Sequence, residues 1–190
     1  MIKESLKQLY KEILNCHGCD LYKGIKNKVC ARGSTKPLVL FIGEAPGRDE
    51  DRIGKPFVGA AGKLLDMWIK QLGLSEKEYA ITNVVRCFPH DERFRPVKPP
   101  REIVQKCFSF LEREIAILRP KLIVLLGATA FEAFYPGEKN KPWNSLFYND
   151  KYGAMFLIKH PAYYLRRNEV PDLSRLKQVI NSLKKEEGNE

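Results

Sequence analysis

Five cysteines are the residues of this sequence whose type and spacing most directly suggest chemistry. Cys16 and Cys19 form a C-x-x-C pair, Cys87 and Cys107 lie far downstream, and Cys30 stands apart from both pairs. In a chain without an apolar signal-peptide core, cysteines are more typically reduced thiols or metal ligands than disulfides. Four thiolates suit zinc or an iron–sulfur cluster, while buried thiols beside a chance C-x-x-C pair remain open from spacing alone. Cys30 could replace one of the four, but its position before a predicted strand favours a bystander role.

Other reactive groups follow predicted strands. Near-continuous apolar runs indicate buried strands at 37–43, 79–85, 121–127 and 154–160. They alternate with helices expected at 2–14, 60–72, 102–118, 128–135 and 172–185. This order predicts an α/β protein, a three-layer α/β/α fold with a four-stranded parallel sheet. Ligands of such folds bind beyond the carboxyl ends of the strands, where the segment GEAPG (43–47), Asn83, Gly127 and His160 fall.

The composition limits the class of partner. The 190 residues carry a net charge of +10, which suits a polyanion, nucleic acid before a membrane surface. No apolar run approaches the roughly 18 residues of a membrane span, so an integral membrane protein is excluded. We expect one cytoplasmic domain over 1–190, with a cluster-binding N-terminal segment at 1–36.

Three longer motifs carry a family resemblance. They are GEAPGRDEDRIGKPFVGAAGKLL (43–65), TNVVRCFP (82–89) and HPAYYLR (160–166). Together with the two cysteine pairs, and in this order over nearly the whole chain, they resemble the family 4 uracil-DNA glycosylases. The resemblance implies a uracil-DNA glycosylase-like fold and a monomeric, monofunctional N-glycosyl hydrolase. Such an enzyme removes uracil from single- or double-stranded DNA in base excision repair and leaves an abasic site.

The resemblance also assigns roles to cysteines. Cys16, Cys19, Cys87 and Cys107 resemble the ligands of a 4Fe-4S cluster, which places iron–sulfur ahead of zinc. The cluster is expected to be structural, tying residues 16–19 to the segment 87–107.

The resemblance also implies which residues of the three motifs bind uracil. By resemblance, His160 donates to uracil O2 as the leaving group departs, and Asn83 reads O4 and N3–H with its amide. Phe57 resembles the aromatic side chain that stacks on the flipped base. Glu50 resembles the residue placed near uracil C5, where thymine carries a methyl group. Gly43 is expected in the same uracil-binding segment.

The attacking water has two candidate holders. Glu44 resembles the family's glutamate near the water, although a solvated or helix-capping carboxylate is nearly as good a reading. Some members of the superfamily place an aspartate one position later, where this chain has Ala45, a residue of the uracil-binding segment that cannot act as a base. Backbone carbonyls or Glu44 would therefore hold the water.

Basic residues flank the predicted pocket. Arg93, Arg95 and Arg166 are the expected contacts to the DNA backbone. The family usually has asparagine before the arginine in the loop after the third cysteine. This chain has Glu92-Arg93 there, in a lengthened loop, so the asparagine's contact is missing and the groove or the cover of the cluster is altered.

Three alternatives compete with this reading. A non-catalytic iron–sulfur DNA-binding protein would lack the pocket residues, which are all present. A covalent uracil-DNA-binding relative needs a histidine in a loop after the first motif, and residues 44–65 contain none. A zinc-containing phosphotransferase would carry a Walker-type glycine-rich loop, which this sequence lacks.

Overall fold

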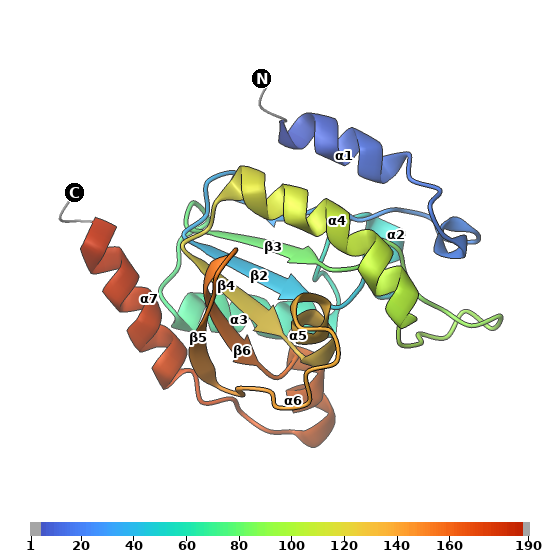
Figure 1. The fold of residues 1–190 in the computed structure, drawn as a ribbon. Helices are drawn as coiled ribbons and strands as arrows, with labels where there is room; N and C mark the ends of the chain where they lie inside the picture. Colours follow the sequence, from blue (N-terminus) through green and yellow to red (C-terminus); the bar gives the residue numbers. More distant parts are fainter. Residues whose placement is uncertain (1–4, 188–190) are drawn as a thin grey trace.

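One six-stranded sheet forms the centre of the molecule (Figure 1). The computed structural model describes residues 5–187. Four parallel strands, in the order β3-β2-β4-β6, form the middle of the sheet: β2 (Val39–Gly43), β3 (Tyr79–Asn83), β4 (Leu122–Leu126) and β6 (Gly153–Ile158). Two antiparallel strands, β1 (Arg32–Gly33) and β5 (Ser145–Asn149), pair with β3 and β6 at the edges.

The three-layer α/β/α class is confirmed, but the expected strand number was wrong. The sequence predicted only the four parallel strands. β1 is two residues long, too short to show any periodicity. No residue of β5 is buried, and Tyr148 is 75% exposed, so this edge strand lacks the apolar run that marks the central strands.

Seven α-helices surround the sheet in the described part of the chain. They are α1 (Leu6–Leu14), α2 (Arg48–Ile53), α3 (Ala60–Gln71), α4 (Arg101–Leu118), α5 (Ala128–Phe134), α6 (Pro161–Arg167) and α7 (Ser174–Glu187), with a 3₁₀ turn at Asp20–Tyr22. α2 and α6 were not predicted, because α2 (RDEDRI) has a single apolar residue and α6 begins with Pro161. The expected start of the first helix at residues 2–4 lies outside the described residues.

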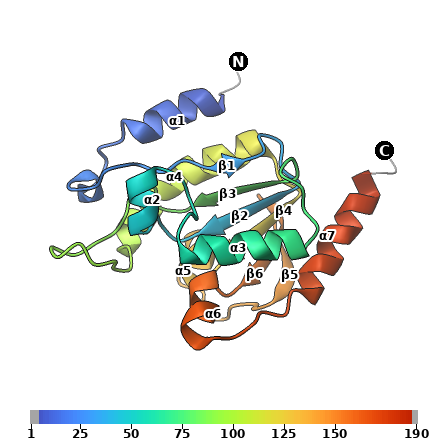
Figure 2. The ribbon, with the colours of Figure 1, turned by 180° about the vertical axis from the view of Figure 1, so that it is seen from behind.

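Alternation along each strand divides the core into two halves. On β2, the side chains of Val39 and Phe41 join a cluster with α3 and α7, whereas Leu40 and Ile42 join a cluster with α4 and α5. Figures 1 and 2 show α4 across one face of the sheet and α3 across the other. Both faces of the parallel strands are therefore covered, which explains their near-continuous apolar sequences.

The N-terminal segment attaches to this body at two places. α1 packs along α4 outside the three layers, and β1 completes the edge of the sheet beside β3 (Figure 2). Among residues 5–187, no helix has both the length and the apolar character needed to cross a lipid bilayer.

Candidate active site at the carboxyl ends of the strands

A cavity of about 250 Å³ lies at the carboxyl ends of β2, β3 and β6. The predicted residues among those that line it are Glu44, Ala45, Glu50, Phe57, Asn83 and His160. Pro46 and Gly47, of the predicted segment GEAPG, also line it, and the wall is completed by residues that were not singled out: Ala61, Phe88, Pro89, Pro96, Val97 and Ala162. The structure thus gathers into one cavity residues that lie more than 100 positions apart in the sequence.

Strand alternation explains why three of these groups meet. Gly43 shares the face of Phe41, and Asn83 shares the face of Ile81, which belong to the core cluster beside α3. His160 continues the same face two residues beyond Ile158. Because the strands are parallel and adjacent or nearly so, these positions reach the same edge of the sheet on the same side.

Gly43 is the point at which the side chains of Asn83 and Phe57 approach the backbone of β2. A Cβ at this position would lie 2.5 Å from both Asn83 Oδ1 and Phe57 Cζ. No side chain fits there without displacing one of them. Glycine is therefore required at this strand end by the close packing of the amide and the ring.

Asn83 presents an unsatisfied acceptor. The residue is only 3% exposed, and its Oδ1 has no hydrogen-bond partner in the structure. A buried polar atom left unpaired costs about 1–3 kcal/mol. An unpaired acceptor in a cavity wall is expected of a ligand-binding group. A ligand N–H that donates to Asn83 Oδ1 would remove the free-energy cost of leaving this oxygen unpaired.

Phe57 is held by contacts on both sides of its backbone. Its φ is 54°, a left-handed conformation uncommon for residues other than glycine. A Cβ on Gly62 would lie 1.9 Å from the Phe57 carbonyl oxygen, so helix α3 can approach this closely only at a glycine. Arg32 donates to the Pro56 carbonyl at 3.0 Å and pairs with Asp66 at 2.6 Å. The ring is thus fixed in the cavity wall before any ligand arrives.

The imidazole of His160 has a defined tautomer and charge. The backbone N–H of Ala162 donates to Nδ1 at 3.1 Å, so the proton of the neutral ring is assigned to Nε2. Burial, with a smaller effect of the Arg166 charge, lowers the pKa of His160 to about 4. At neutral pH the ring is therefore uncharged and carries a single N–H donor. Its centroid lies 5.6 Å from that of Phe57.

Glu44 is anchored by a residue that the sequence analysis did not predict. The hydroxyl of Thr129, in the first turn of α5, donates to Glu44 Oε2 at 2.5 Å. The Glu44 carbonyl accepts from Val85 N–H at 2.9 Å, which ties this segment to the chain beyond β3. Nothing in the sequence of α5 singles out this hydroxyl; the only signal was that Gly127, two residues earlier, ends a predicted strand.

The carboxylate of Glu50 accepts hydrogen bonds from three backbone N–H groups. Oε1 accepts from the N–H groups of Val58 and Gly59, both at 2.8 Å, and Oε2 accepts from that of Gly47 at 3.0 Å. These bonds join α2 to the segment that carries Phe57. Glu50 lines the cavity as predicted, and the structure adds that it fixes the shape of the cavity wall.

The predicted DNA-backbone arginines lie outside the cavity on exposed positions. Arg93 and Arg95 belong to a compact turn in which Asp91 Oδ1 accepts from both of their backbone N–H groups, at 3.0 and 2.9 Å. Arg95 also pairs with Asp91 through its guanidinium at 2.6 Å. Arg166 lies near enough to His160 to lower its pKa.

Four cysteines come together beside the site from three separate segments. Cys16 follows α1, Cys19 precedes the 3₁₀ turn, Cys87 follows β3, and Cys107 lies within α4. Burial, followed by the neighbouring Cys107, Cys19 and Cys16 thiols, raises the pKa of Cys87 to about 12. The four thiols are therefore close enough to interact electrostatically.

The donor type of this group fits a thiolate-bound metal centre. Four soft sulfur donors suit iron–sulfur clusters and zinc alike. Within residues 5–187, no three His, Cys, Asp or Glu side chains stand in a metal-binding arrangement, so the thiols are gathered without being closed around a centre. The fifth thiol, Cys30, interacts instead with the buried pair of Arg86 and Glu114.

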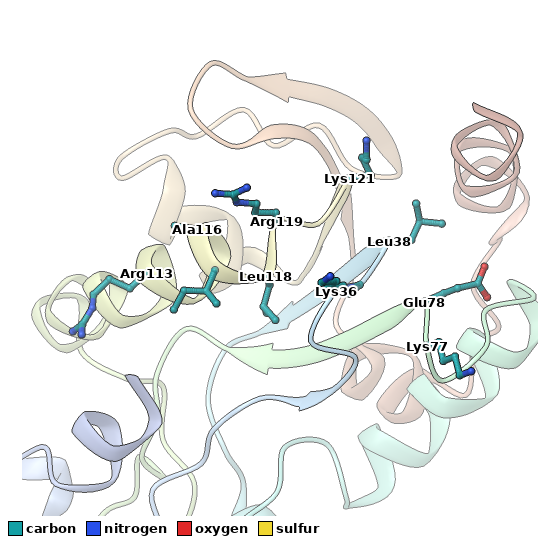
Figure 3. A pocket seen from close by; sticks show the side chains of 11 residues that line it. Lys36, Leu38, Lys77, Glu78, Arg113, Ala116, Leu118, Arg119 and Lys121 are labelled. Carbon is teal, nitrogen blue, oxygen red and sulfur yellow. The ribbon is translucent and has the colours of Figure 1, made fainter. Parts of the chain in front are cut away.

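A larger groove of about 780 Å³ lies at the opposite end of the sheet (Figure 3). Leu38, directly before β2, and Lys121, directly before β4, place it at the amino ends of the strands. It contains none of the predicted pocket residues. In an α/β sheet the carboxyl ends are the functional end, so the smaller cavity is the candidate active site.

The comparisons with known proteins show the family of the chain. Residues 30–184 match the model of the uracil DNA glycosylase superfamily, and the chain belongs to that superfamily. Within it, the chain belongs to the type-4 uracil-DNA glycosylases.

Three relatives with that name show the extent of the similarity. The Archaeoglobus fulgidus protein is 44% identical over 132 residues, which cover 70% of this chain and 64% of the relative. The Saccharolobus solfataricus protein is 42% identical over 94% of this chain and 88% of its own length. The Thermotoga maritima protein is 34% identical over 96% of this chain and 94% of its own length.

Proposed function

We propose that this protein hydrolyses the N-glycosidic bond between uracil and deoxyribose in DNA, leaving an abasic site. The observation that carries the proposal is the meeting of an orphan acceptor on Asn83 and a neutral N–H donor on His160 in one small cavity. The name of the relatives of this chain, type-4 uracil-DNA glycosylase, supports the same activity.

The chemistry follows from what each group can do. Uracil inside a duplex is out of reach, so the base must be flipped into the cavity at a cost of a few kcal/mol. There Phe57 offers a stacking face, Asn83 Oδ1 accepts from uracil N3–H, and the Asn83 amide N–H₂ donates to O4.

Bond cleavage places negative charge on the departing base. As the C1′–N1 bond breaks, its electron pair moves to uracil, and His160 Nε2–H donates to O2, where that charge develops. A water held by Glu44 adds its oxygen to C1′ and passes a proton to the Glu44 carboxylate, and the uracil anion takes up a proton from solvent. The products are free uracil and an abasic sugar.

The direct test uses a uracil-containing oligonucleotide and an otherwise identical thymine oligonucleotide. We expect alkaline treatment after incubation to cleave the uracil strand alone, because only its abasic site is alkali-labile. Purified, cluster-loaded protein that gives no cleavage of either strand would contradict the activity. Single-stranded and duplex substrates are compared in the same assay, since we propose action on both by a cytoplasmic monomer.

A 4Fe-4S cluster held by Cys16, Cys19, Cys87 and Cys107 completes the proposal. When bound, it supplies a covalent cross-link between the end of α1, the chain after β3 and α4. The first and last of these residues, Cys16 and Cys107, lie 91 positions apart in the sequence, so ligation would close a long loop and couple folding to metal binding.

We expect Cys107→Ser to lose both iron and solubility, whereas Cys30→Ser keeps both. The reason is that Cys107 belongs to the group of four interacting thiols and Cys30 does not. The measurements are iron content, visible absorption and the soluble fraction of protein prepared without oxygen. Stoichiometric zinc without visible absorption in the wild type would contradict the iron–sulfur assignment.

A further inference from the structure

Thr129, in the helix that follows β4, contacts Glu44, the residue that we propose holds the water. No residue of β4 itself lines the cavity. β4 ends at Leu126, and Gly127, with a φ of 96°, turns the chain into α5. Thr129, only 6% exposed, then donates its hydroxyl to Glu44 Oε2 at 2.5 Å. It does not itself line the cavity.

The hydroxyl determines which carboxylate oxygen is available. Once Oε2 accepts from Thr129, Oε1 is the oxygen left for a water at C1′. A glutamate side chain has several rotatable bonds and is half-buried here, so without an anchor it samples other positions. The backbone of Glu44 is already fixed through its carbonyl by Val85 N–H. The two contacts together hold both ends of the residue.

We propose that Thr129 is a positioning residue that orients Glu44 toward the attacking water. The inference rests on the proposed glycosylase activity. In the reaction, the water oxygen bonds to C1′ as the C1′–N1 electron pair leaves with uracil, and the water proton passes to Glu44 Oε1. Thr129 touches neither the base nor the water; it keeps Glu44 in the one orientation that serves this step.

The test compares two substitutions of similar size. Thr129→Val keeps the shape but removes the hydroxyl, and we expect the single-turnover rate of uracil excision to fall about 10- to 100-fold. Thr129→Ser keeps the hydroxyl, and its rate is expected to stay within about threefold of wild type. Affinity for uracil-containing DNA and the thermal unfolding midpoint are expected to change little in either variant.

A double-mutant cycle separates positioning from a general structural role. In a Glu44→Gln background, Thr129→Val is expected to cause almost no further loss, because the residue that it orients is already disabled. An equal loss in both backgrounds, a wild-type rate for Thr129→Val, or a Thr129→Ser rate as low as that of Thr129→Val would overturn the inference. The wild-type protein is assayed alongside the variants. If it excises no uracil, the proposed activity fails; if it does excise uracil, the rates of the variants test the role of Thr129.

Discussion

Replacing His160 with alanine is expected to lower the single-turnover rate of uracil excision by about 10²–10⁴-fold. The imidazole is neutral, and its free donor is Nε2–H, because Ala162 N–H occupies Nδ1. This donor interacts most strongly with the charge that develops on uracil O2, so its loss affects the transition state more than the bound substrate. Binding of uracil-containing DNA is therefore expected to change little.

The pH dependence provides an independent readout. Because the pKa of His160 is about 4, the ring stays neutral throughout the range from pH 5.5 to 8. We expect the wild-type rate profile to show no inflection near 6.5, the value of an unperturbed histidine. A rate that is unchanged in His160→Ala at equal iron content would show that the leaving group is stabilised elsewhere.

Replacing Asn83 with aspartate is expected to reduce the preference for uracil over cytosine by about 10²-fold. The amide accepts from uracil N3–H through Oδ1 and donates to O4, whereas cytosine offers an acceptor at N3 and a donor at N4. Cytosine therefore faces two mismatched contacts, each costing about 1–3 kcal/mol. A carboxylate cannot donate to O4 but can accept from the cytosine amine.

The measurement is single-turnover excision of both bases by three proteins. Asn83→Asp should lose rate on uracil and gain trace activity on cytosine. Asn83→Ala is the matched control, which should lose rate on uracil without any gain on cytosine. If the ratio of the two rates is the same in wild type and Asn83→Asp, Asn83 is not the residue that reads the base.

The parts of the site that were predictable are those tied to strand ends. Asn83 and His160 follow apolar runs, and parallel strands must bring such positions to one edge, so the sequence indicates their meeting. The four thiols were predictable as a group because of their residue type and the family resemblance. Phe57 was reached through motif resemblance alone, since it lies on no periodic element. Glu44 lies in the segment GEAPG that follows a predicted strand, but its role came from the resemblance.

The remaining features depend on tertiary contacts that leave no periodic signal. Thr129 carries the one hydroxyl of a short, mostly apolar helix, and only the structure shows that it faces Glu44. The hydrogen bonds to the Glu50 carboxylate come from backbone N–H groups, which nearly every residue provides, so the sequence does not mark them. Strand β5 is half-exposed, so its side chains do not alternate as those of a buried strand do.

The cavity has a further consequence for how the chain matures. Its groups come from the ends of β2, β3 and β6, so only a fragment that runs at least from Glu44 to His160 contains Glu44, Phe57, Asn83 and His160 together. While the chain is being synthesised, the segments that carry Phe57 and Asn83 are complete before His160 has been added. The histidine to which we assign stabilisation of the leaving base follows β6, which pairs with β4, so we expect a fragment that ends before β6 to be inactive in uracil excision.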